Sequence, residues 1–232
     1  MKKIAVVTLG LSIAVSVAVK AQNNNSLSTT GITSGGMAYN LTNKEDTKGS
    51  QFLFDTWVKG SMADAKGNAV NADGYSFNYD KLGGALLLSQ DKQTAIAVDK
   101  DRARTFILYD KADKALKFEY VPVIDAKLYC EVLSAGAKYK IYKLTKTKFI
   151  KADYKNDGIS SSGNKYDEFT DEFGYYVADA KGGAPQKISL KNKAIKQAFA
   201  ADADKVKAYF DAHKDDKIND AFLAGLGDAL NQ

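Results

Sequence analysis

The chain has 232 residues, of which 33 are Lys or Arg, 28 are Asp or Glu, one is Cys and one is His. A single cysteine excludes a domain held together by disulfides, and a single histidine excludes a zinc centre built on several histidines. The first 21 residues contain three lysines and no acid, so the remainder has 30 basic and 28 acidic residues, a net charge of about +2. This balance, with only two arginines in the chain, argues against a nucleic-acid partner.

Residues 1–21 have the pattern of a secretory signal peptide. Two lysines precede an uncharged run from Ile4 to Val19, and the small residues Val19 and Ala21 fit a signal peptidase site. Polar and small residues interrupt the run, which falls short of the ~20 apolar residues of a membrane-spanning helix. The sequence therefore predicts export across the inner membrane, to the periplasm or the outside, with no transmembrane segment in the mature chain.

Residues 22–36 are small, polar and nearly uncharged, which is typical of a flexible lead-in. From residue 37 to residue 190, β-branched and aromatic runs alternate with turns rich in Gly, Asn and Asp. This pattern predicts a mainly antiparallel β-meander that forms a curled sheet or a partly closed barrel. The expected strands are Phe52–Val58, Tyr75–Tyr79, Ala85–Leu88, Thr94–Val98, Arg104–Tyr109, Lys117–Ile124, Leu128–Leu133, Tyr139–Leu144, Lys148–Ala152, Gly174–Val177 and Lys187–Leu190.

Three of these strands carry a more specific expectation. Ala85–Leu88 does not alternate between apolar and polar residues, so both of its faces should be covered. Pro122 cannot donate a ladder hydrogen bond, so its strand should lie at an edge or carry a bulge there. Alternation places Cys130 on the same face as its apolar neighbours Leu128 and Val132, which predicts a buried, unreactive thiol.

Four aromatic residues on the early strands are candidate ligand-binding residues: Trp57, Tyr75, Phe77 and Tyr79. The last three share one strand face by alternation. Aromatic rings on strands are more often core or cross-strand pairs, and a ligand platform requires several of them on an exposed face. Core packing is therefore the competing interpretation.

The acidic stretch between residues 153 and 172 is the nearest approach to a metal motif. Its first six residues are superficially similar to a calcium-binding EF-hand loop, but Lys155 occupies the third position and Asn164 the twelfth, where acidic ligands are needed. A looser calcium site would use carboxylates of this stretch, with a solvated acidic turn as the alternative. The candidate ligands are Asp153, Asp157, Asp167 and Asp171.

Residues 191–232 change to helical periodicity and predict three short amphipathic helices packed on the β body. Asp202 and Asp216 stand where N-caps of the second and third helices are expected. His213 continues the apolar stripe of the second helix, so packing is a better interpretation than catalysis.

Three segments carry a resemblance to a group of known proteins: Gly49–Gly60, Asn78–Asp80 and Tyr175–Val177 ahead of the lysine-rich helices. Together they resemble uncharacterised secreted proteins of Gram-negative bacteria. The resemblance implies secretion and a β-rich body with a helical tail, and it supplies no activity or catalytic residue.

The sequence thus predicts an α+β protein that acts without catalysis as an envelope binding or interaction protein, whose partner is a small molecule or an envelope protein. No nucleophile-elbow or phosphate-loop motif is present. A carboxylate-dependent hydrolase remains the alternative, because its signature is the spatial separation of two acids.

Overall fold

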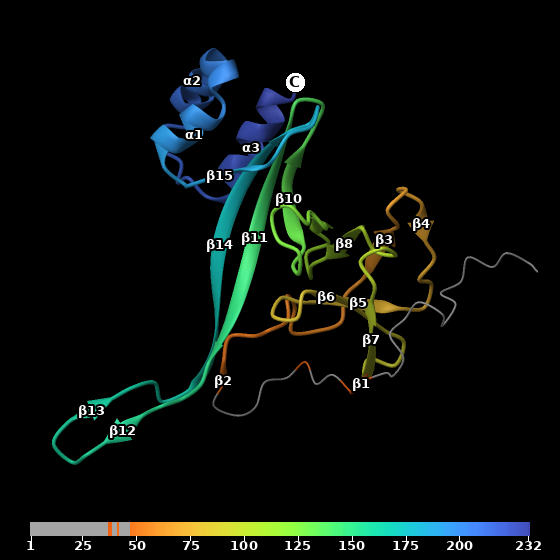
Figure 1. The fold of residues 1–232 in the computed structure, drawn as a ribbon, viewed down its shortest axis with the longest axis vertical. Helices are drawn as coiled ribbons and strands as arrows, with labels where there is room; N and C mark the ends of the chain where they lie inside the picture. Colours follow the sequence, from red (N-terminus) through yellow and green to blue (C-terminus); the bar gives the residue numbers. More distant parts are fainter. Residues whose placement is uncertain (1–36, 39–40, 42–46) are drawn as a thin grey trace, which may run out of the picture.

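The computed structural model of the protein describes residues 37–38, 41 and 47–232 (Figure 1). The predicted signal peptide, residues 1–21, and the lead-in, residues 22–36, lie outside these residues. The described part consists mostly of antiparallel β-sheets and ends in a short helical region, so the predicted α+β class is confirmed. No described helix is both long and apolar enough to span a membrane.

The smaller main sheet has four antiparallel strands in the order β1-β7-β6-β5. Its central strand β6 is buried on both faces, as its apolar run predicts: Leu86 and Leu88 join one core cluster and Leu87 another. The strands are β1(Met37–Ala38), β5(Ser76–Asp80), β6(Ala85–Ser89) and β7(Thr94–Val98).

The larger sheet has nine strands, eight of them in the order β15-β14-β11-β10-β9-β8-β3-β4, with the short β2 added in parallel to β14. Its two end strands do not pair with each other among the described residues, so the sheet is open rather than a closed barrel. The strands are β2(Thr47–Lys48), β3(Gly60–Ala63), β4(Ala69–Val70), β8(Thr105–Tyr109), β9(Ala115–Glu119), β10(Cys130–Ala135), β11(Tyr139–Ile150), β14(Asp167–Asp179) and β15(Gln186–Ile188).

The two sheets share an aromatic core. Phe77 and Tyr79 of β5 pack with Phe106 of β8, Phe118 of β9 and Tyr129 just before β10. The Phe106 and Phe118 rings stack at 4.8 Å between centroids, and Tyr79 meets Tyr129 edge-on at 5.9 Å. Such aromatic pairs add to the free energy gained from burial and fix how the sheets sit on each other.

The predicted strand Phe52–Val58 is wrong as a regular strand. The segment makes only isolated bridges, Phe52 to Asp80 and Val58 to Phe77. The reason is the fully buried Asn78, whose amide accepts from Phe54 N at 3.3 Å and donates to Phe54 O at 2.8 Å. A side chain therefore satisfies backbone groups that a continuous ladder would otherwise pair.

Two other strand expectations need correction. The strand expected over Lys117–Ile124 ends at Glu119, so Pro122 lies in the following turn rather than at an edge or a bulge. The irregularity in register lies on β10 instead, between Val132 and Ser134. Cys130 is fully buried as predicted, and burial raises the pKa of its thiol to about 12.

A long two-stranded ribbon extends beyond the rest of the larger sheet. β11 and β14 pair from Tyr139 with Asp179 to Ile150 with Glu168, and the small hairpin β12(Lys155–Asn156) and β13(Ser161–Ser162) forms the tip (Figure 1). The sequence predicted two separate strands in place of β11 and only a short segment of β14. The intervening threonines suit a strand, and Phe149 pairs across the ribbon with Phe169 at 4.9 Å, so the ladder continues.

Three helices close the chain, as predicted. They lie at the end of the ribbon opposite its tip (Figure 1). They are α1(Asn192–Ala198), α2(Ala203–Ala212) and α3(Asp220–Leu230), with a single 3₁₀ turn η2(Ala200–Asp202) before α2. α3 lies on β10 and β11, where Gly227 permits close approach, since a Cβ there would stand 2.6 Å from Ser134 and 2.8 Å from Ile141.

The predicted caps of the second and third helices are not formed as expected. Asn219, not Asp216, caps α3, by accepting from Phe222 N at 3.0 Å. Asp202 occupies the cap position of α2 but makes no capping bond, because its carboxylate instead accepts from Tyr139 OH at 2.6 Å and pairs with Lys138. This carboxylate therefore ties the helices to β11.

Candidate functional site

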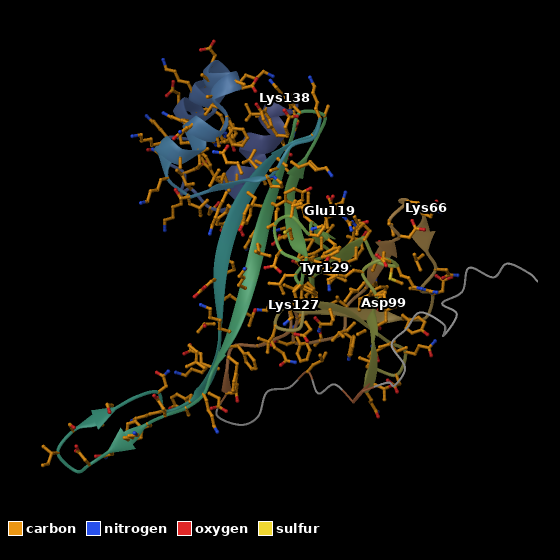
Figure 2. The ribbon with its side chains drawn as sticks, viewed as in Figure 1. Lys66, Asp99, Glu119, Lys127, Tyr129 and Lys138 are labelled. Atoms are coloured by element: carbon orange, nitrogen blue, oxygen red, sulfur yellow. The ribbon has the colours of Figure 1, made fainter. Side chains whose placement is uncertain are left out.

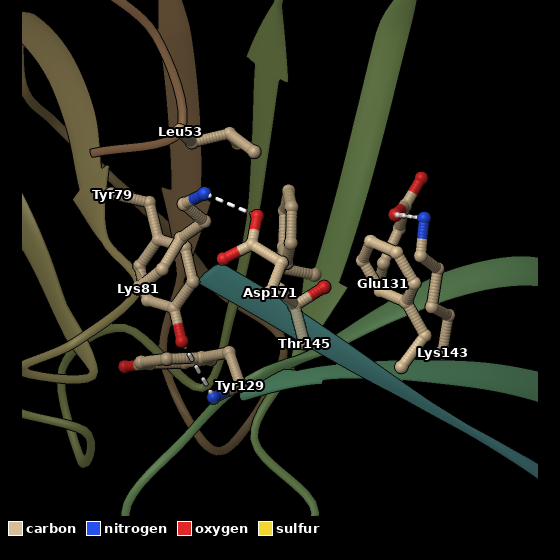
Figure 3. A pocket seen from close by; sticks show the side chains of 10 residues that line it. Leu53, Tyr79, Lys81, Tyr129, Glu131, Lys143, Thr145 and Asp171 are labelled. Atoms are coloured by element: carbon tan, nitrogen blue, oxygen red, sulfur yellow. Dashed lines mark hydrogen bonds and ion pairs between the residues drawn. The ribbon is translucent and has the colours of Figure 1, made fainter. Parts of the chain in front are cut away.

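A pocket of about 250 Å³ opens where the two sheets meet the ribbon (Figure 3). Its walls come from the β5–β6 turn, β9, β10, β11 and β14, which are far apart in sequence. Concave sites with apolar walls and a few placed polar groups are the usual form of small-molecule sites. We therefore take this inter-sheet pocket as the candidate functional site.

The apolar wall of the pocket is aromatic and rigid. Tyr79, Phe118 and Tyr129 are all core residues with their rings against one another. Tyr79 OH accepts from Tyr129 N at 3.0 Å, and Tyr129 OH donates to Ala103 O at 2.7 Å. Burial raises the pKa of both hydroxyls well above the usual range, so both tyrosines stay neutral and fixed.

One polar group of the pocket is the ion pair between Lys81 and Asp171. Lys81 Nζ lies 2.6 Å from Asp171 Oδ2, and Asp171 Oδ1 accepts from Thr147 Oγ1 at 2.6 Å. Lys81 follows β5 in a turn that Asp80 holds by accepting from Leu82 N and Gly83 N. The pair therefore joins the smaller sheet to the ribbon, with both carboxylate oxygens occupied.

The second polar group is an incompletely satisfied carboxylate. Glu131 Oε2 lies 3.9 Å from Lys143 Nζ, whereas the same ammonium lies 2.5 Å from Asp220 Oδ2. No hydrogen bond to the Glu131 carboxylate exists among the described residues. Burial raises the pKa of Glu131, and the nearby Lys143 only partly offsets this. Glu131 is thus a half-buried carboxylate of the pocket that is free to accept a hydrogen bond from a ligand.

Phe173 of β14 also lines the pocket. It is 54% exposed, and Lys143 Nζ lies 4.5 Å from its ring centroid. A half-exposed ring in the same lining as the half-buried Glu131 offers an apolar contact to a ligand.

The structure disperses the four predicted ligand-binding aromatics. Tyr79 lines the pocket, Phe77 is buried in the core behind it, and Tyr75 is half-buried against that core. Trp57 packs with a different cluster and donates from Nε1 to Lys92 O at 3.0 Å. The shared face of Tyr75, Phe77 and Tyr79 is therefore a core face, and only Tyr79 contributes to the candidate site.

The four predicted calcium ligands lie along the ribbon and are engaged separately. Asp153, Asp157 and Asp167 accept from backbone amides of their own loops at 2.7 to 2.8 Å, from Asn164, Ser160 and Ala152 respectively. Asp171 is held by Lys81 and Thr147 in the pocket. Within the described part of the chain, no three His, Cys, Asp or Glu side chains gather in a way that could hold a metal ion.

His213 does not line the pocket. It ends α2, stacks on Tyr209 at 4.2 Å between centroids, and its Nδ1 lies 2.8 Å from Asp216 Oδ2. The side chain is 40% exposed, so the histidine packs on the helical surface rather than inside the core.

Sequence reasoning missed Lys81, Glu131 and Lys143. The alternation around Cys130 does place Glu131 on the opposite strand face, but a charged residue there is normally taken as solvated. Lys81 sits in an Asp-Lys-Leu-Gly-Gly turn that shows no special feature. Only the packing of the two sheets brings these residues together.

Comparison with protein-family models, curated proteins and solved structures finds no match to this chain. The case for function therefore rests on the geometry of the pocket.

Proposed function

We propose that this protein is an exported, non-catalytic binding protein that takes a small ligand in the inter-sheet pocket. The observation that carries the proposal is the half-buried Glu131 carboxylate, which lies at the aromatic wall with its nearest cation, Lys143 Nζ, at 3.9 Å. Partial burial of a charged group costs stability, and a donor from a bound ligand would offset that cost. Export rests on the pattern of residues 1–21.

The pocket supports a ligand of limited size with a donor at one end. Its volume of about 250 Å³ is below the ~300 to 1,000 Å³ of pockets for drug-sized molecules. The wall of Tyr79, Phe118 and Tyr129 suits a ring or a short aliphatic group. Glu131 suits an ammonium or hydroxyl donor, because it offers two acceptor oxygens and no proton when ionised.

Carboxylate-dependent hydrolysis is less well supported. The pocket does contain two acids, Glu131 and Asp171. However, Asp171 already accepts from Lys81 and Thr147 through both of its oxygens. The Lys81 ammonium and the Thr147 hydroxyl both stabilise the ionised form of Asp171 and lower its basicity, which makes it a poorer nucleophile or general base.

The test is a fragment screen by ligand-observed NMR on the mature chain, with a pocket-filling variant and a matched control. Thr145→Trp places an indole in the pocket, whereas Lys148→Trp places it on the opposite face of the same strand. We expect small ring-bearing amines and alcohols to bind the wild type and the Lys148→Trp variant but not the Thr145→Trp variant. Equal binding by all three proteins, or no binding by the wild type, would refute the proposal.

A second candidate function is interaction with another envelope protein through the ribbon. Ile159 at its tip is 98% exposed, and Tyr154 and Tyr166 beside the tip are also exposed. Tyrosine is enriched in protein–protein interfaces, so this tip offers side chains suited to contact with a partner. Replacing residues 153–164 by a two-residue turn would remove the tip, and we expect the shortened protein to retain pocket binding but lose co-fractionation with the envelope.

A further inference from the structure

A second and larger cavity lies on the other side of the β5–β6 turn. It has a volume of about 590 Å³ and is bounded by Gly83–Ala85, by Val98–Arg102 at the end of β7, and by the ring of Tyr120 after β9. It is distinct from the inter-sheet pocket, with which it shares no lining residue. Neither the predicted ligand residues nor the proposed function uses it.

Two cationic side chains line this cavity and two more lie beside it. Lys100 and Arg102 line it, and the guanidinium of Arg104 lies 4.9 Å from the centroid of the Tyr120 ring. Lys100 Nζ lies 5.5 Å from the same centroid and donates to Gly84 O at 3.0 Å. Lys127 donates to Leu82 O at 3.0 Å in the same turn.

None of these four cations forms an ion pair with a described carboxylate. Arg102 and Arg104 are also the only two arginines of the chain, which otherwise uses lysine for its positive charge. Arginine is the side chain best matched to phosphate and carboxylate, because its planar fork donates two parallel hydrogen bonds.

Three acids lie near the cations. Asp99 and Asp101 line the cavity and are exposed. Asp125 is already engaged, since it accepts from Lys127 N and Leu128 N and pairs with Lys146 at 3.0 Å. The lining itself therefore carries two cations and two exposed carboxylates, and Arg104 and Lys127 add positive charge beside it.

Burial, and after it the neighbouring Lys127, lowers the pKa of the Lys100 ammonium against the opposing effect of Asp125 and Asp99. The ammonium is therefore partly removed from water, and an anion in the cavity would stabilise its charged form.

We propose that this cavity binds a phosphate group, carried by a small phosphate monoester rather than by a membrane lipid. A phosphate monoester has a charge of about −1.5 to −2 at neutral pH, and the four cations in and beside the cavity, which form no ion pair among the described residues, would offset it. The cavity is larger than phosphate alone requires, and Tyr120 gives the organic part a ring to contact. This site does not depend on the inter-sheet pocket.

The experiment is a calorimetric titration of the mature chain at low ionic strength with inorganic phosphate, phenyl phosphate and phosphatidylglycerol vesicles. We expect saturable binding of phenyl phosphate, weaker binding of inorganic phosphate, and no saturable binding of vesicles. Arg102→Gln should weaken phenyl phosphate binding by at least about 10-fold, since it removes a charge-assisted hydrogen bond. Lys193→Gln removes an exposed charge on α1, at the other end of the molecule, and should change nothing.

Three results would overturn the proposal. The first is the absence of saturable phenyl phosphate binding, and the second is an equal loss of phenyl phosphate affinity in Arg102→Gln and Lys193→Gln. The third is binding to vesicles alone. If Arg102→Gln does not fold, Arg102→Lys keeps the charge and loses the fork, and it should still weaken binding several-fold. Asp99, which lines the cavity, and Lys127, which lies beside it, are labelled in Figure 2.

Discussion

Phe222 provides the sharpest test of how the helices are joined to the sheets. Its side chain is 5% exposed and meets the rings of Tyr209 and Phe210 at 5.2 and 5.1 Å between centroids. The same cluster contains Tyr139 and Ile141 of β11. Phe222→Ala removes a buried aromatic ring and leaves a cavity, so we expect the free energy of unfolding to fall by ~3 to 5 kcal/mol.

The whole described domain should lose this stability, not only the helices. α3 lies on β10 and β11, and these strands also carry Glu131 and Lys143 into the inter-sheet pocket. α3 packs on these strands, α1 packs on β15, and α2 packs on α3, and such short helices would not be stable alone. Unfolding of the helical end should therefore be coupled to unfolding of the sheets.

Equilibrium urea unfolding with two probes measures the effect. Circular dichroism near 222 nm follows the helices, and fluorescence of Trp57, the only tryptophan, follows the smaller sheet. Both transitions should move together to lower urea. Phe173→Ala is the matched control, because Phe173 is 54% exposed and its loss should cost less than about 1 kcal/mol. A shift of the helical signal without a shift in Trp57 fluorescence would refute the coupling.

Four further outcomes are expected. The intact mass of the exported protein should correspond to cleavage after Ala21, and retention of Met1 would contradict the export prediction. Cys130 should react with a thiol reagent only after denaturation, and rapid labelling of the native protein would contradict its burial. His213→Gln should lower the melting temperature slightly and leave ligand affinity almost unchanged, whereas loss of affinity at constant stability would make His213 functional. Glu131→Gln should raise the melting temperature at neutral pH but not below about pH 4, measured by thermal melts across pH; an equal shift at both would show that charge is not the cause.

Glu131→Gln is expected to raise stability at neutral pH because the pKa of Glu131 is raised. The pKa is raised in the folded state, so the unfolded chain holds this proton less tightly than the folded protein. Below the usual pKa of about 4.3 the carboxyl is protonated in both states and costs no stability. As the pH rises through the pKa of the folded protein, its ionisation lowers the free energy of unfolding. Glutamine cannot ionise, which removes this cost.

Sequence patterns predicted the elements that local chemistry determines. Alternation placed β5 and β8 within a residue of their ends, and helical periodicity identified all three helices. Local patterns failed where a distant side chain replaced a backbone partner. The Asn78 amide donates a hydrogen bond to Phe54 O. Asp202 accepts a hydrogen bond from Tyr139 OH instead of capping its own helix.

The candidate sites were less predictable because each is made by contacts across the sheets. Lys81 and Asp171 are 90 residues apart and meet only because the smaller sheet packs on the ribbon. Arg102 and Tyr120 line one cavity, but no motif or residue spacing in the sequence indicates that they do. The residue types in one stretch of sequence cannot predict such contacts, because the two partners lie in different stretches and no periodic pattern links them.

Glu131 is the residue where the local rules of folding and the structure disagree most. A glutamate on a half-buried strand should point to water or find a full set of partners, as Asp171 does with Lys81 and Thr147. Glu131 instead shares Lys143 with Asp220, which takes the shorter contact. The raised pKa means that the ionised form of Glu131 is disfavoured in the folded protein, and a donor from a ligand at the pocket wall would offset that cost. If Glu131→Gln both stabilises the protein and abolishes fragment binding, the lost stability is the cost of recognition.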